Sequence, residues 1–367
     1  MAQANKAKKA YLVLQDGTVM QGYSMGAQGV TIGEVVFNTC TASYQDLLSD
    51  PTYYGQIVAQ TYPLVGNRGV DAAQGKSEIM ANGYIAREWC DTPTDAGNGV
   101  TLDTYLKSRG IVGLCGIDTR RLTRILRDKG YFNGAITDTL DNLEELLKKI
   151  KAYTIAGAVE QVTIREPEVI EAENAKYHMV IMDYGFHREI LQWFTKRGCK
   201  LTLVPAGTSP QDVLSYHPDG ILLSDGPGDP DDNLKLIENI RELTKSGVPL
   251  FGLGLGHQML ALAVGAKIQK MSRGHRGSNQ PVRILSNGKV MITTQNHGYD
   301  VDKESLDPAV AEVTMENVND QSVEGIVYHD FPAFTVQFEP CDGKGFQDSA
   351  WIYDEFVAMM KGEEHNA

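Results

Sequence analysis

The stretch from Val248 to Leu260 places the strongest constraint on the fold of this chain. It begins as an apolar run of strand character that ends at Leu253, and glycines alternate at positions 252, 254 and 256. Helical spacing of apolar residues follows directly. We therefore predict a strand, a tight turn and a helix N-terminus, with Gly254 at the carboxyl end of a sheet. A Ser or Cys at such a turn would form a nucleophile elbow, but glycine has no side chain with which to attack.

Strands and helices are predicted to alternate around this turn. The strands are expected over 179–182, 201–204, 220–224 and 248–253. The helices between them are expected over 187–197, after an N-cap at Ser209, and over 233–245. This alternation favours a parallel sheet with right-handed crossovers. Beyond residue 265 the pattern predicts short strands and a last helix, over 281–285, 290–294, 324–328, 333–338 and 346–361.

The first part of the chain predicts a separate domain. A hairpin is expected over 11–22, because Asp16-Gly17 is a turn signal between two strand-like runs. Further strands are predicted over 33–38 and 57–62, and helices from 43 to 50, from 116 onward and over 141–151. Periodicity is lost between 153 and 176, where Gly157, Pro167 and several glutamates gather. The predicted domains are 1–152 and 177–362, with a linker over 153–176 and a tail over 363–367.

Composition narrows the classes of function. The formal net charge of −13 argues against nucleic acid or an anionic membrane as the main partner. No apolar run reaches membrane-spanning length, and the polar, basic N-terminus lacks the apolar core of a secretory signal. The five cysteines are scattered without metal-ligand spacing, which favours reduced thiols in a cytoplasmic protein. They are Cys40, Cys90, Cys115, Cys199 and Cys341.

Four segments carry a family resemblance. The segment 252–258 (GLGLGHQ) resembles the nucleophile motif of class I glutamine amidotransferases, with glycine in the place of the cysteine. The segment 223–230 (LSDGPGDP) resembles the oxyanion loop of that family, and 295–299 (QNHGY) resembles a substrate-binding segment. The segment 336–341 (VQFEPC) resembles the strand that reads VQFHPE in the family. Within this family the chain is most similar to the small subunit of carbamoyl-phosphate synthetase.

The resemblance implies a fold, a partner and a pathway. The expected fold is an N-terminal α/β domain of the small-subunit type, followed by a flavodoxin-like, mostly parallel amidotransferase domain. Family members contact a large synthetase subunit through the first domain, to which 33–67 and 116–134 are similar. That subunit carries ATP and magnesium, so no cofactor or metal is expected in this chain. The associated pathways are pyrimidine and arginine biosynthesis.

All three positions of the catalytic triad differ from the family pattern. Gly254 stands in place of the cysteine, Glu339 in place of the histidine and Cys341 in place of the orienting carboxylate. Glycine cannot attack, and a carboxylate cannot pass a proton between thiol and leaving amine as imidazole does. Cys341 as a relocated nucleophile is disfavoured, because neighbouring Glu339 and Asp342 would raise the pKa of its thiol.

The positions that bind glutamine in the family are better preserved. The resemblance assigns this role to Cys40, Gly226, Gly228, Leu255, Gln258, Asn296, Gly298 and Tyr299. At Cys40 the family has serine, so this contact differs. Backbone amides at 226, 228 and 255 can hold a carbonyl oxygen or an anion. His257, in the first helical turn, is expected to have a packing or cap-region role, and His297 is expected to shape the pocket from a loop-like segment.

Three functions remain open from the sequence. The first is a structural or regulatory partner, without glutaminase activity, of a synthetase large subunit that uses free ammonia. The second is a binding module that senses glutamine or another ligand. The third is an ordinary glutamine-hydrolysing subunit, which would need catalytic residues outside the known pattern.

Overall fold

The computed structural model describes residues 8–40, 44–70, 80–94, 100–130, 132–340 and 348–362. The chain divides into two compact units, Met1–Ile155 and Ala156–Ala367. The division falls inside the segment 153–176 that was predicted as a linker. Much of that segment has regular structure in the second unit, namely α5 (Ala158–Val162) and β10 (Glu168–Ile170).

The first unit is built on a closed barrel with the strand order β1-β2-β8-β6-β4-β3-β9. Its opening hairpin is confirmed: β1 and β2 pair antiparallel, and Asp16 accepts a hydrogen bond from the Thr18 amide in the turn. The barrel strands are β1 (Lys9–Leu14), β2 (Val19–Gly26), β3 (Thr31–Asn38), β4 (Gln56–Gln60), β6 (Gly83–Ala86), β8 (Val112–Cys115) and β9 (Phe132–Thr137). A separate pair is formed by β5 (Leu64–Val65) and β7 (Glu88–Trp89).

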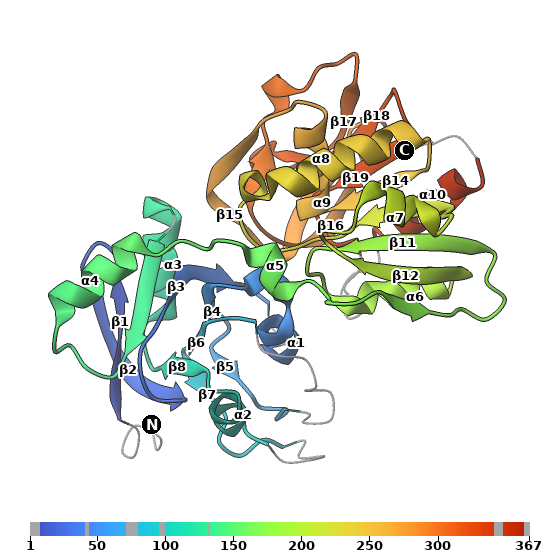
Figure 1. Cartoon of the computed structure of the whole chain (residues 1–367). Helices are drawn as coiled ribbons and strands as arrows, with labels where there is room; N and C mark the ends of the chain where they lie inside the picture. Colours follow the sequence, from blue (N-terminus) through green and yellow to red (C-terminus); the bar gives the residue numbers. More distant parts are fainter. Residues whose placement is uncertain are drawn as a thin grey trace. The chain divides into compact units, whose positions relative to one another are not determined.

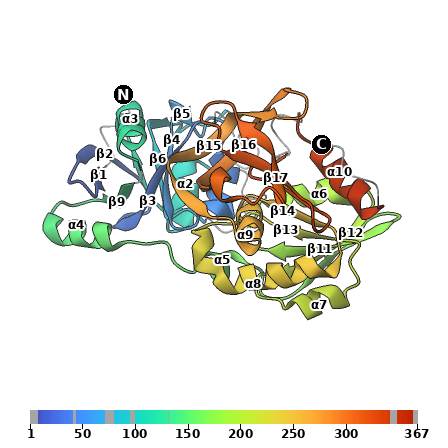
Figure 2. The same cartoon turned by 90° about the horizontal axis from the view of Figure 1, so that it is seen from above.

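Helices cover this barrel with their apolar sides. The helix α4 packs Leu143, Leu146 and Leu147 against Val13 and Ala135 of the barrel strands, and it lies along the outside of the barrel in Figures 1 and 2. The helix predicted from residue 116 is α3, which begins at Thr119 after an Asp118 cap and exposes its arginines as expected. The helices are α1 (Tyr44–Ser49), the 3₁₀ turn η2 (Pro51–Tyr53), α2 (Leu102–Ser108), α3 (Thr119–Lys129) and α4 (Leu143–Ala152).

The second unit is a ten-stranded sheet in the described residues, with the order β10-β12-β11-β13-β14-β19-β18-β17-β15-β16. Its middle is parallel from β12 to β19, and this part has the 2-1-3-4-5 strand order of flavodoxin-like folds. The predicted fold class is therefore confirmed. The parallel strands are β11 (Tyr177–Asp183), β12 (Cys199–Pro205), β13 (Gly220–Leu223), β14 (Leu250–Leu253) and β19 (Ala333–Val336).

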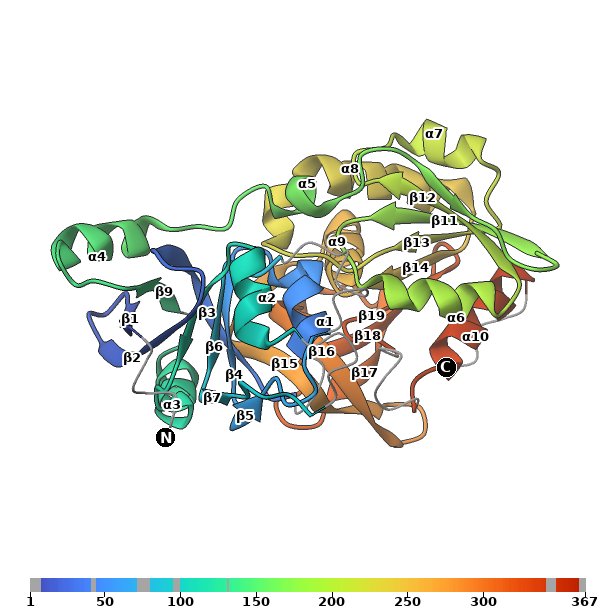
Figure 3. The same cartoon turned by 90° about the horizontal axis from the view of Figure 1, so that it is seen from below.

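Two helical layers bury the parallel strands. The helices α7, α8 and α9 pack on one face through residues such as Val213, Ile240 and Met259, and α6 and α10 pack on the other through Phe194 and Phe356. Figure 3 shows α6 and α10 on the face opposite to α7 and α8. These elements are η3 (Arg188–Ile190), α6 (Leu191–Thr195), α7 (Pro210–Ser215), η4 (Pro230–Asn233), α8 (Leu234–Leu243), η5 (Thr244–Ser246), α9 (Leu255–Ala263) and α10 (Trp351–Met360).

The other half of this sheet is antiparallel, and it differs from the prediction in three places. The strand predicted over 281–285 begins at Ile268, β17 was not predicted, and the loop-like segment 295–299 lies inside β16. β15 was obscured because its long run of polar residues, in which His275 and Arg276 are buried, does not alternate with apolar ones. β17 does alternate apolar with polar residues, so its sequence carried a strand signal that the prediction missed. The strands are β15 (Ile268–Ile284), β16 (Val290–Val301), β17 (Ala311–Asn317) and β18 (Val323–Tyr328), with η6 (Lys303–Ser305).

Two predicted helix starts, Ser43 and Phe346, lie outside the described residues. The predicted Ser209 N-cap is confirmed, because its hydroxyl accepts a hydrogen bond from the Asp212 amide over 3.1 Å. Across the described ranges, none of the helices combines the length and apolar character needed to cross a membrane.

Candidate functional site

The predicted strand, turn and helix are present around Gly254. β14 ends at Leu253, α9 begins at Leu255, and Gly254 between them has φ +49° and ψ −108°. The Gly254 amide donates to the Val336 carbonyl over 3.0 Å, which ties the turn to the end of β19. Glycine accepts this backbone conformation without the steric penalty that a side chain brings. The geometry of an elbow is therefore kept at a position that has no nucleophile.

The carboxylate of Asp225 lies against this turn. Its Oδ1 accepts hydrogen bonds from the Gly226 amide over 2.7 Å and from the Leu255 amide over 2.9 Å. A β-carbon at position 254 would overlap the same carboxylate. An anion is favoured here because the first amides of α9 point toward it with the positive end of the helix dipole. The chain thus places one of its own side chains on two amides that the resemblance assigned to glutamine.

Gln258 connects α9 to the antiparallel strands. Its buried Nε2 donates to the Tyr299 carbonyl and to Gln337 Oε1, each over 2.8 Å. The Tyr299 hydroxyl in turn donates to Asp229 Oδ2 over 2.8 Å. All four segments singled out from the sequence therefore meet in the fold. The Gln258 amide donors are occupied by Tyr299 and Gln337, so the expected contact to glutamine would have to come from another atom of this side chain.

The remaining predicted binding residues fall in three places. Asn296 and Gly298 lie on β16 beside Tyr299, and Gly228 lies in the loop after β13. Cys40 belongs to the first unit, where its amide donates to Asn38 Oδ1 over 2.6 Å and its carbonyl accepts from Gln60 Nε2. The binding roles of all these residues stay predictions.

The two other positions that the resemblance assigned to the triad follow β19. Glu339 is half-buried, and its amide donates to the Thr294 carbonyl over 3.0 Å, so it borders β16. Cys341 lies outside the described residues. Its candidate role as a relocated nucleophile therefore stays a prediction.

His257 is fully buried in α9, in agreement with the expected packing role. Its Nδ1 lies 2.7 Å from Thr335 Oγ1, and within the described parts of the chain no group hydrogen-bonds its Nε2. Burial lowers the pKa of His257 to about 3. The imidazole is therefore neutral at physiological pH, and it packs between α9 and β19.

His297 belongs to a buried polar network and not to a loop. Its Nδ1 donates to the Tyr299 carbonyl over 2.8 Å, and its Nε2 lies 3.0 Å from Gln295 Oε1. The Gln295 amide nitrogen donates to Glu324 Oε2 over 2.8 Å. Burial, together with neighbouring His275, lowers the pKa of His297 well below its usual value.

His275 completes this network from β15. Its Nε2 lies 2.8 Å from Asp320 Oδ2, and its Nδ1 lies 3.5 Å from Glu324 Oε1. Burial alone would lower the pKa of His275, but the two carboxylates outweigh it and raise the pKa to about 9. The cluster thus favours positive charge at His275.

Sequence reasoning missed Asp225, Glu324 and Gln337 as parts of the site. Asp225 was visible as an acid before Gly-Pro-Gly at the predicted end of a strand. Its contact with Leu255 spans 30 residues, so only the parallel pairing of β13 with β14 reveals it. No sequence signal marked Glu324, which lies in an otherwise apolar strand.

Known proteins resemble the chain over nearly its whole length. Residues 12–136 match the family model of the carbamoyl-phosphate synthase small chain, CPSase domain, and residues 180–359 match that of glutamine amidotransferase class-I. A carbamoyl phosphate synthase small chain from Listeria monocytogenes serotype 4b (strain F2365) is 42% identical, over 97% of this chain and 98% of its own.

Two further relatives have the same extent. A carbamoyl phosphate synthase small chain from Vibrio cholerae serotype O1 is 44% identical, over 97% of this chain and 99% of its own. A carbamoyl phosphate synthase pyrimidine-specific small chain from Halalkalibacterium halodurans is 43% identical, over 98% and 99%. These matches cover both units described above, so the chain belongs to the family of carbamoyl-phosphate synthase small chains.

Proposed function

We propose that this chain is a subunit of a carbamoyl-phosphate synthase that does not hydrolyse glutamine. It pairs in the cytoplasm with a large subunit that uses free ammonia and binds ATP and magnesium, in pyrimidine or arginine biosynthesis. The observation that carries the proposal is the Asp225 carboxylate, which accepts hydrogen bonds from the Gly226 and Leu255 amides beside Gly254.

Two physical effects support the absence of glutamine hydrolysis at Gly254. Hydrolysis of an amide needs a nucleophile and amides that stabilise the developing oxyanion. Gly254 supplies no nucleophile, and a carboxylate already bound to the amides repels a second negative charge there. Loss of one member of a catalytic group costs about 10⁴-fold or more in rate, so these losses together predict no measurable turnover.

The test is a reconstitution with the large subunit encoded in the same genome. We expect carbamoyl phosphate to form from ATP, bicarbonate and ammonium, and the presence of this chain to add no glutamine-dependent synthesis. Glutamine-dependent synthesis would contradict the proposal. Its loss in a Cys341→Ala variant would then identify Cys341 as a relocated nucleophile, whereas its persistence would support an ordinary subunit with other catalytic residues.

A second candidate function is a binding module for glutamine or a similar ligand. It is favoured by the hydrogen bonds that join the segment 223–230, α9 and β16, because these are the segments assigned to ligand binding. A ligand amide oxygen would have to compete with Asp225 for the amides of Gly226 and Leu255. Removal of that carboxylate should therefore strengthen binding.

Calorimetric titration with glutamine, glutamate and asparagine tests this candidate. We expect millimolar glutamine binding that becomes about tenfold tighter in Asp225→Ala, which corresponds to about 1.4 kcal/mol. The matched control is Asp212→Ala, which removes a carboxylate at the start of α7. The candidate fails if none of the three ligands binds at millimolar concentration, or if Asp225→Ala leaves a measured affinity unchanged.

A further inference from the structure

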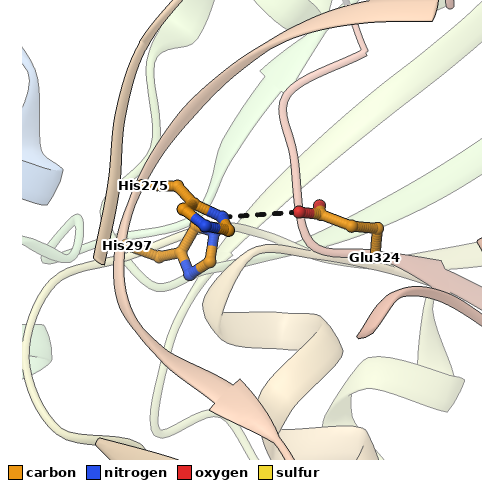
Figure 4. Close-up of side chains that lie close together, drawn as sticks. All are labelled: His275, His297 and Glu324. Carbon is orange, nitrogen blue, oxygen red and sulfur yellow. Dashed lines mark ion pairs between the residues drawn. The ribbon is translucent and has the colours of Figure 1, made fainter. Parts of the chain in front are cut away.

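Three buried side chains on three different strands converge in the antiparallel half of the large sheet. His275 lies on β15, His297 on β16 and Glu324 on β18, with exposed fractions of 7%, 9% and 0%. One nitrogen of each imidazole and one oxygen of the carboxylate lie within 4.8 Å of one another. Figure 4 shows the two imidazoles side by side and the carboxylate directed toward His275.

The orientation of His275 points its Nδ1 toward Glu324 Oε1 and Asn317 Nδ2. Its Nε2 lies 2.8 Å from Asp320 Oδ2, the distance of a hydrogen bond that this nitrogen donates. Its Nδ1 then lies 3.5 Å from Glu324 Oε1, beyond the usual range of about 2.7–3.2 Å for a hydrogen bond. A separation near 3.5 Å is typical of two ligands on one tetrahedral ion with bonds of about 2.0–2.2 Å. A carboxylate behind the imidazole also orients many metal-binding histidines.

The lone pair of His297 also faces an acceptor and not a donor. Its Nδ1 donates to the Tyr299 carbonyl, so the neutral ring has its lone pair at Nε2. That lone pair lies 3.0 Å from Gln295 Oε1, which is itself an acceptor. Turning the Gln295 amide around would not help, because its nitrogen donates to Glu324 Oε2 and Thr293 Oγ1. Two acceptors in a buried site therefore face each other, and a cation would relieve their repulsion.

We propose that His275, His297 and Glu324 bind a divalent transition-metal ion such as zinc. Two imidazole nitrogens and one carboxylate oxygen are a ligand set that suits zinc, with a water or Gln295 Oε1 in the fourth position. Glu324 and Asp320 supply two negative charges, which a divalent ion balances. The ion binds at Nδ1 of His275 in place of a proton, so metal binding releases that proton.

The consequence of such an ion is structural. It links β15, β16 and β18 beside the segment 296–299, which carries Asn296, Gly298 and Tyr299. This function is independent of the proposed loss of glutaminase activity, so either proposal can fail alone.

The experiment measures metal content and cobalt binding on the full chain, purified without a polyhistidine tag. After removal of metal by chelation, we expect one equivalent of Co²⁺ to bind with visible absorption bands of a tetrahedral site, and one equivalent of Zn²⁺ to remove them. Glu324→Gln should abolish the bands. Asp320→Asn, which alters a half-exposed residue behind His275, should weaken cobalt binding about 10–100-fold.

The matched control is His178→Asn. His178 lies on β11 of the same unit, hydrogen-bonded to Thr202 and apart from the cluster, so this variant should keep the full equivalent. Circular dichroism confirms that each variant is folded; if Glu324→Gln is not, Asp320→Asn carries the test. The proposal is overturned if the unaltered chain binds no equivalent of cobalt, or if Glu324→Gln and Asp320→Asn bind cobalt as tightly as His178→Asn does. It is also overturned if nitrogen NMR shows that both nitrogens of His275 carry a proton at saturating zinc.

Discussion

The two halves of the large sheet use polar groups in opposite ways. In the parallel half the strands are apolar, and the polar groups of the site follow the strand ends, where Asp225 binds backbone amides. In the antiparallel half the polar groups lie within the strands, where Gln295, Glu324 and Asn317 are buried and bond to each other. The first arrangement depends on backbone shape, and the second on particular side chains.

This difference explains how the turn at Gly254 keeps its shape without a side chain. At the end of β14 the turn needs a residue that accepts φ +49° and has no β-carbon to overlap Asp225, and glycine meets both conditions. In the network around Glu324 each side chain satisfies a buried neighbour, so a substitution leaves a partner unpaired. Substitutions in the parallel half should therefore change chemistry, and substitutions in the antiparallel half should change stability.

The largest expected effect is a return of chemistry in the parallel half. Gly254→Cys alone should release no ammonia from glutamine, because its β-carbon overlaps Asp225 and no imidazole is present to activate the thiol. Adding Asp225→Ala, Glu339→His and Cys341→Glu removes the overlapping carboxylate and supplies an imidazole and a carboxylate at the other two positions. The fourfold variant should exceed the single one by about 10⁴-fold in ammonia release, measured on the purified chain.

Two outcomes would contradict this account. Ammonia release by Gly254→Cys alone would mean that Asp225 and Glu339 do not block the site. A threefold variant that keeps Asp225 and equals the fourfold one would mean that this carboxylate moves aside at little cost. Each variant is compared with the unaltered chain, and its thermal unfolding shows that the fold is kept.

The next effect compares the stability of the two halves. Glu324→Ala removes the acceptor for Gln295 and Asn317, and it should lower the free energy of unfolding of the second unit by about 3 kcal/mol or more. Asp225→Ala frees the Gly226 and Leu255 amides, as the loss of a helix cap does, and should cost only about 1 kcal/mol.

Urea unfolding followed by tryptophan fluorescence measures both values. Trp193 and Trp351 report on the second unit, and a Trp89→Phe background removes the signal of the first. If the slope of the unfolding free energy against urea concentration is unchanged, the substitution altered stability and not the extent of unfolding. Equal losses in the two variants would contradict the comparison between the halves.

The contrast between the parallel and antiparallel halves also determines how much of the structure could be predicted from the sequence. Apolar runs and helix caps were enough for the parallel half, including the turn at Gly254 and the cap at Ser209. The antiparallel half was predicted less well, because strands such as β15 bury His275 and Arg276 where the pattern shows only polar residues. In the site, motif spacing located Gln258 and Tyr299, but their mutual hydrogen bond and the contact of Asp225 with Leu255 required the tertiary structure.

The smallest expected effect concerns His257, which packs between α9 and β19. Its pKa is about 3 in the folded chain because the imidazole is buried, against about 6.5 in an unfolded chain. Between these values the unfolded state binds more protons than the folded state, so this residue reduces stability as pH falls below 6.5. From pH 6.5 to 5.5 the loss should be about 1 kcal/mol. A His257→Gln variant lacks this titration, and its free energy of unfolding should fall less by that amount over the same interval. The two chains are compared by urea unfolding at each pH in the Trp89→Phe background. Parallel pH profiles would mean that His257 takes up a proton in the folded state and finds a partner for it, against the packing role assigned here.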